Sequence, residues 1–132
     1  MKIWKAAIAS MAQSSSVQVL GAGSRVVNGL YASRPAAQIP AGFAATCRTM
    51  GWDSAQTWKK LSDQKRPWYE KTDGSYVYWN TQDHKWWIDG PDGAGLYVVR
   101  DDSGSSVPPG KGWTALSGAQ QPVPSVEVKD EL

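Results

Sequence analysis

Residues 67–90 carry a dense run of large aromatic side chains separated by polar, turn-forming residues. Aromatic side chains favour strands because their flat rings fit the pleated, half-buried surface of a sheet. Asp73-Gly74 and the polar segment 81–84 supply turns inside the run. The pattern predicts a twisted antiparallel β-meander of at least three strands within residues 67–100. One face of so small a sheet cannot bury all of the rings, so some must cap an edge, line a groove or contact a partner.

The alternation of side chains predicts which rings share a face of this sheet. Successive residues of a strand point to opposite faces, so Tyr76 and Tyr78 share one face and Trp79 lies on the other. The adjacent Trp86 and Trp87 also point to opposite faces, so we expect one in the core and one more exposed. The predicted contact surface consists of these rings and their neighbours: Trp68, Tyr76, Tyr78, Trp79, Asn80, Trp86, Trp87 and Trp113.

Residues 40–63 predict a two-helix insertion ahead of the aromatic run. Pro40 suits the first turn of a helix, where its missing N–H costs nothing, and Gly51 is a suitable C-terminal stop. Asp53 is a good N-cap for a second helix. Cys47 falls on the apolar face of the first helix, and we expect it to be buried and unreactive, packing as a small apolar side chain.

A chain of 132 residues is long enough for one domain with extensions at both ends. We expect an N-terminal extension over residues 1–16, consisting of a short helix and a serine linker. Residues 17–126 form a single aromatic-rich β module, and residues 127–132 form an acidic C-terminal tail. The predicted fold class is α+β: a small antiparallel, aromatic-rich β-meander with an inserted αα-hairpin and extended termini.

The charges of the chain nearly balance, because 14 lysines and arginines face 12 aspartates and glutamates. Such a weak overall field gives no reason to expect nucleic acid or an anionic membrane as a partner. The one basic cluster comprises Lys59, Lys60, Lys65 and Arg66. It is typical of a solvated helix face.

The side chains that most often supply catalysis are scarce. Cys47 is the only cysteine and His84 the only histidine, so the sequence has no ligand set for zinc or an iron–sulfur cluster. The loop 89–95 lacks the alternating acidic ligands and closing glutamate of an EF-hand. We therefore predict no catalytic residue, no cofactor and no metal site, and a protein that is not an enzyme.

The two ends of the chain carry possible targeting signals. The last four residues, 129–132, read Lys-Asp-Glu-Leu, the address that retains proteins in the endoplasmic reticulum. That address works only if a signal peptide delivers the chain to the lumen. Residues 1–12 hold early lysines and a short, alanine-rich apolar run, which is poor for a signal peptide and too short for a transmembrane span. A short amphipathic or docking helix is the alternative, and the ending is then accidental.

Aromatic and turn residues follow one another in a definite order along residues 17–126. They are Asn28-Gly29-Leu30-Tyr31, Gly42-Phe43, Thr46-Cys47, Trp52, Thr57-Trp58, Pro67-Trp68, Gly74, Tyr76 to Asn80, Trp86-Trp87-Ile88-Asp89, Gly95-Leu96-Tyr97, Pro108-Pro109, Gly112-Trp113 and Pro122-Val123-Pro124. This order resembles an uncharacterised module that recurs in dinoflagellate and related algal proteins. The resemblance implies a structural or binding role, with no catalytic residue or cofactor. It also suggests a setting among accessory subunits at the periphery of photosynthetic, plastid or respiratory membrane complexes.

A second set of residues lies within the aromatic run, in the order Trp68, Gly74, Tyr76, Tyr78, Asn80, Trp87 and Pro91. This order resembles the WW domain, a three-stranded sheet that binds proline-rich peptides. The interval from Asn80 to Trp87 is shorter than in that family, and Thr81 stands where a histidine is familiar. The resemblance implies a peptide groove between an exposed tyrosine and an exposed tryptophan.

Two functional classes follow from the sequence. In the first, the protein is a non-catalytic accessory subunit or interaction module that fastens to other protein subunits of a larger assembly. In the second, it is a recognition module whose exposed Trp and Tyr rings stack on a carbohydrate or a proline-rich peptide. In that case Asn80, Gln82 and Asp89 would supply hydrogen bonds.

Overall fold

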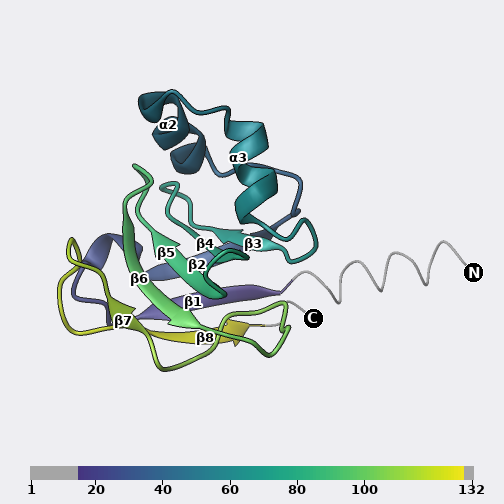
Figure 1. The fold of residues 1–132 in the computed structure, drawn as a ribbon. Coiled ribbons are helices and arrows are strands. Elements are labelled where there is room, and N and C mark those ends of the chain that lie inside the picture. Colours follow the sequence, from purple (N-terminus) through teal and green to yellow (C-terminus); the bar gives the residue numbers. More distant parts are fainter. Residues whose placement is uncertain (1–14, 130–132) are drawn as a thin grey trace, which may run out of the picture.

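Eight strands form one antiparallel sheet in a computed structural model that describes residues 15–129 (Figure 1). Their order across the sheet is β7-β6-β5-β4-β3-β2-β1-β8, so nearly all neighbours in space are also neighbours in sequence. The small α+β fold predicted from the sequence is confirmed. The strands are β1 (Ser16–Leu20), β2 (Gly29–Arg34), β3 (Trp68–Glu70), β4 (Tyr76–Asn80), β5 (Lys85–Asp89), β6 (Gly95–Arg100), β7 (Thr114–Ala115) and β8 (Ser125–Lys129).

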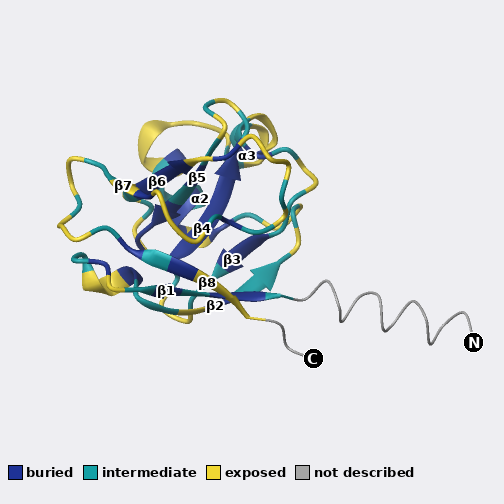
Figure 2. Cartoon of the chain, turned by 90° about the horizontal axis from the view of Figure 1, so that it is seen from below, coloured by how far each residue is buried: buried dark blue, intermediate teal, exposed yellow. Residues whose placement is uncertain are grey.

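The sheet curls around an inner core that its own side chains fill. Figure 2 shows the central strands largely buried and the loops intermediate or exposed, and β4 is buried along its whole length. Trp113, from the segment after β6, returns to pack in this core. The inner core contains Val17, Val19, Ala22, Val27, Tyr31, Tyr69, Val77, Trp79, Trp86, Ile88, Tyr97, Val99, Trp113 and Val126.

Two helices cover part of the outer face, above β3 and β4 (Figure 1). They are α2 (Ala41–Met50) and α3 (Ser54–Leu61), and a short 3₁₀ turn, η1 (Arg25–Val27), lies ahead of β2. The predicted caps are in place, because Gly51 ends α2 with a left-handed backbone and the Asp53 carboxylate accepts a bond from the N–H of Gln56. A second aromatic cluster lies beneath the helices: Phe43, Cys47, Trp58, Trp68, Tyr76 and Tyr78. The predicted burial of Cys47 is confirmed.

The last strand pairs with the first. β8 lies antiparallel to β1, with Ser16 opposite Lys129. Glu127 to Lys129 thus belong to the sheet, although the sequence placed them in a tail. Pairing with β8 satisfies the edge of β1, which would otherwise present unpaired backbone groups. The rest of the KDEL ending and nearly all of the predicted N-terminal extension lie outside the described residues. Within residues 15–129, neither helix has the length and apolar character needed to cross a bilayer.

Gly42 brings α2 close to the loop that follows β5. A methyl group at this position would lie 2.6 Å from the carbonyl oxygen of Pro91 and 2.9 Å from the backbone nitrogen of Gly93. We expect Gly42→Ala to lower the free energy of unfolding by about 1–3 kcal/mol, because backbone atoms must move to admit the group. Gly118→Ala is the matched control, since it meets no atom within 4 Å. Urea unfolding measures both, and equal values would show that this approach is not tight.

Candidate functional site

The rings that the sequence assigned to a contact surface lie mostly inside the protein. Trp68, Tyr76 and Tyr78 are covered by the helices, whereas Trp79, Trp86 and Trp113 fill the curled sheet. Asn80 is also buried, and of the predicted surface only Trp87 is partly exposed. These side chains are therefore packing groups rather than a solvent-facing surface. The physical reason is that the sheet curls over one of its faces while α2 and α3 cover the other.

The hydrogen bonds of the indoles reinforce this assignment. Each buried tryptophan donates its ring N–H to an oxygen of the protein, as does the partly exposed Trp87. Such bonds satisfy the polar end of a ring whose body is packed in the core. The donors and acceptors are Trp58 to Ala36 O, Trp68 to Gln38 O, Trp79 to Asp101 O, Trp86 to Asp101 Oδ2, Trp87 to Asp83 Oδ2 and Trp113 to Pro109 O.

Trp52 differs from every other tryptophan of the described chain. As a residue it is 53% exposed, and within residues 15–129 its ring N–H has no hydrogen-bond partner. The backbone holds it in place, because its N–H donates to the carbonyl oxygen of Cys47 at 2.8 Å. Sequence reasoning missed this residue as a contact candidate. The available signal was its position between the stop glycine of α2 and the N-cap Asp53 of α3, where a side chain belongs to neither helix face.

A groove of about 550 Å³ lies beside Trp52. One wall is α3, and the other is the turn between β4 and β5. The N–H of Thr81 donates to the carbonyl oxygen of Leu61 at 2.7 Å and so joins the turn to the end of α3. The Asn80 side chain accepts from the N–H of Gln82 at 2.9 Å and fixes the turn further. The lining residues are Trp52, Asp53, Gln56, Thr57, Lys60, Leu61 and Gln82.

Several polar groups of this groove are uncommitted. Within the described residues, the side-chain ends of Gln56, Lys60 and Gln82 make no hydrogen bond or ion pair, and all three side chains are exposed. Asp53 uses one carboxylate oxygen to cap α3. The groove therefore combines an exposed indole with donors and acceptors that are free to meet a ligand.

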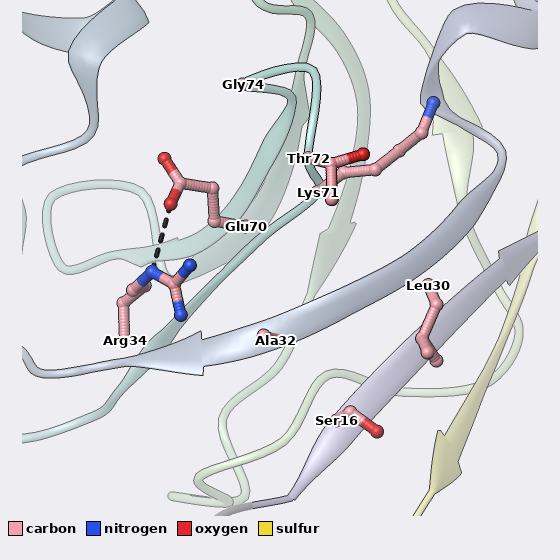
Figure 3. Close-up of a pocket in the computed structure, with 8 residues that line it drawn as sticks. All are labelled: Ser16, Leu30, Ala32, Arg34, Glu70, Lys71, Thr72 and Gly74. Atoms are coloured by element: carbon pink, nitrogen blue, oxygen red, sulfur yellow. Dashed lines mark hydrogen bonds and ion pairs between the residues drawn. The ribbon is translucent and has the colours of Figure 1, made fainter.

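The hollow in Figure 3 differs from the groove beside Trp52, because its charged side chains already have partners. It occupies about 380 Å³ on the outer face of β1 and β2, where Leu30 is 57% exposed. Arg34 and Glu70 point toward each other across this face and form an ion pair of 2.9 Å. Lys71 points away from that pair and bonds to Asp73 and to a backbone carbonyl oxygen. The charged side chains that line this hollow are therefore already paired.

Two further hollows lack the combination of an exposed indole and unpaired polar side chains that the groove beside Trp52 has. Beside η1, the lining residues include Arg25 and Gln121 but no aromatic ring. In the other, the Arg66 guanidinium stacks 3.8 Å from the centre of the Trp79 ring and pairs with Asp63. Arg66 thus differs from the solvated helix-face residue that the basic cluster predicted, because it caps a core ring from a loop.

Asp89 is the carboxyl group that the fold perturbs most. It is 4% exposed on the outer face of β5, opposite Tyr76 of β4. Burial raises the pKa of Asp89 to about 7, the Tyr76 hydroxyl partly offsets this effect, and the Asp92 charge adds to it. Oδ1 of Asp89 and the Tyr76 hydroxyl nevertheless lack hydrogen bonds of normal geometry within the described residues. Asp89 lines none of the four hollows, so we assign it to the core.

His84 belongs to an exposed ion cluster. Its Nδ1 lies 2.9 Å from Asp102, which also pairs with Arg100 at 3.0 Å. The bonds from His84 and Arg100 hold the pKa of the Asp102 carboxyl below its usual range. Within residues 15–129, no group of three or more His, Cys, Asp or Glu side chains is placed to hold a metal ion.

No protein-family model, curated protein sequence or solved structure significantly matches the chain.

Proposed function

We propose that this protein acts by contact rather than by catalysis, as a recognition or interaction module. The observation that carries the proposal is Trp52, a tryptophan that is more than half exposed and whose ring N–H is unpaired among residues 15–129. Exposed aromatic rings of this kind dominate binding energy when a partner buries them. The contact site is thus the helical end of the molecule, not the sheet from which the sequence predicted it.

A second apolar side chain supports this location. Met50, the last residue of α2, is 55% exposed and lies two positions before Trp52. Met and Trp are both enriched where proteins meet their partners. Gly51 and the caps of the two helices fix the backbone between them, so a partner would meet an ordered surface and would lose little entropy in ordering it.

The accessory-subunit function is the second candidate, and the outer face of β2 favours it. Leu30 is exposed there in a part of the sheet that the helices leave uncovered (Figure 1). A subunit of a larger assembly, including one at the periphery of a membrane complex, would dock through this face. In that arrangement Leu30, rather than Trp52, would carry the contact.

One experiment separates the two candidates. Tagged full-length protein is expressed in the cells that naturally make it, as wild type, Trp52→Ala and Leu30→Ala, and bound partners are quantified by mass spectrometry and glycan analysis. We expect Trp52→Ala to reduce recovery of specific partners about tenfold or more, as for a hot-spot residue, and Leu30→Ala to leave it unchanged. Loss of partner recovery in Leu30→Ala alone would favour the accessory-subunit function. Equal recovery in all three would contradict contact at either site.

A further inference from the structure

We propose that the groove beside Trp52 binds a neutral sugar ring, with one face of the pyranose stacked on the Trp52 indole and its hydroxyls bound by Gln56 and Gln82. This inference rests on the proposed contact function and names its ligand. The same chemistry is present in a free polysaccharide and in a glycan attached to a protein. The groove recognises the sugar in either form.

The indole supplies the apolar half of the site. A pyranose has a face made largely of C–H groups, and the π face of an aromatic ring is electron-rich and attracts the positive edges of such groups. Trp52 is the described tryptophan whose ring is free to accept a partner, because the other six are buried or hold their N–H in an internal bond. Its own ring N–H, unpaired within residues 15–129, is a further donor in a residue that lines the groove.

The two glutamines supply the polar half. A primary amide offers both donors and acceptors, and so does each sugar hydroxyl. Gln56 projects from α3 and Gln82 from the turn between β4 and β5, and together with Trp52 they line the same groove. Their amides make no hydrogen bond within the described chain. A ligand therefore gains these bonds without breaking any that the fold uses.

The charges of the groove favour a neutral ligand. Lys60 and Asp53 are of opposite sign and line the same hollow, so neither an anion nor a cation meets matched charge there. A proline-rich peptide fits less well, because its recognition uses a groove lined by several aromatic rings, whereas Trp52 is the single aromatic lining residue. A volume of about 550 Å³ lies within the usual range for small-ligand sites.

The test follows the Trp52 indole N–H directly by NMR on the ¹⁵N-labelled full chain. The signal that disappears in Trp52→Phe is assigned to Trp52 among the eight tryptophans of the sequence. Maltohexaose and cellohexaose represent free polysaccharides, a high-mannose N-glycan represents protein-linked sugar, and decaproline is the non-sugar comparison. Each is titrated to about 10 mM, where a site with a Kd of about 1 mM is nearly saturated.

We expect at least one sugar to shift the Trp52 signal and the side-chain amides of Gln56 and Gln82 in a saturable way. A response to the free oligosaccharides would identify a free polysaccharide as the natural ligand, and a response to the N-glycan would identify a glycan attached to a protein. Trp52→Ala is expected to weaken sugar binding about tenfold or more. The separate double variant Gln56→Ala with Gln82→Ala is also expected to weaken it, and Leu30→Ala is expected to leave it unchanged. The double glutamine variant keeps the test valid if Trp52→Ala fails to fold.

Three results would overturn the inference: no saturable shift of Trp52 with any sugar, sugar binding that survives both groove variants, or a response to decaproline alone. Each leaves the contact function standing if partner recovery still depends on Trp52. Absence of sugar binding to the wild-type protein, together with partner recovery that is independent of both Trp52 and Leu30, would remove both proposals.

Discussion

Replacing Trp86 with alanine is expected to lower the free energy of unfolding by about 3–5 kcal/mol. Trp86 is 0% exposed and lies in the inner core, where it pairs with Trp79 of the neighbouring strand. Its ring N–H donates to Asp101 Oδ2 at 3.0 Å. The substitution removes the ring and also deprives a buried carboxylate of a donor, which places the cost toward the upper end of the range.

Trp87 is the matched control for this substitution, because it is the next residue of β5 and faces the other side of the sheet. It is partly exposed, so we expect Trp87→Ala to cost about 1–2 kcal/mol. Urea unfolding followed by circular dichroism compares the two variants. Equal losses in the free energy of unfolding would show that the Trp86 and Trp87 rings contribute equally to the core, contrary to this prediction.

Stability is expected to fall as the pH rises from about 4 to 7 because of Asp89. Its pKa is about 7 in the folded protein and about 3.8 when exposed. Over this window the folded state keeps a proton that the unfolded state releases, so unfolding becomes easier by about 1.4 kcal/mol per pH unit. The free energy of unfolding is therefore about 4 kcal/mol lower above pH 7 than below pH 4 on account of Asp89.

Other carboxyl groups act in a different pH window. Burial opposes ionisation of Asp63, Asp73 and Asp101, but hydrogen bonds from neighbouring groups outweigh it and lower their pKa values. Their stabilisation is complete above the ordinary carboxyl pKa and is lost as the pH falls through the lowered values. The decline between pH 4 and 7 therefore reports Asp89 rather than these residues.

Asp89→Asn tests this assignment, because the amide is similar in shape and stays neutral. We expect the variant to be more stable than the wild type at pH 8 by about 2–4 kcal/mol, with little difference at pH 4. Asp92→Asn, in the exposed loop after β5, is the control and should keep most of the pH dependence. Carboxyl chemical shifts measure the pKa directly. An Asp89 pKa near 4, or an unchanged slope in Asp89→Asn, would refute the prediction.

Local sequence patterns predicted the side-chain faces of the central aromatic strands, but not β8, which the sequence placed in a tail. Alternation placed Tyr76 and Tyr78 opposite Val77 and Trp79, and the structure puts these pairs in separate cores. Gly51 and the N-cap Asp53 likewise mark the helix boundaries. These features depend on residues close in sequence, because a strand has a side-chain period of two and a helix end is set by the backbone groups of a single turn.

The covering of each face was decided by tertiary structure alone. Ser16 and Lys129, 113 positions apart, meet where β8 joins β1, and the curl of the sheet then buries Trp86 and Trp113. The helices similarly bury Trp68 and leave Trp52 exposed. Alternation tells which face a side chain points to, but burial depends on what distant segment arrives to cover that face. The sequence by itself therefore determined the helix ends and the aromatic faces of the central strands, whereas only the three-dimensional packing added β8 to the sheet and left Trp52 as the exposed tryptophan ring among residues 15–129.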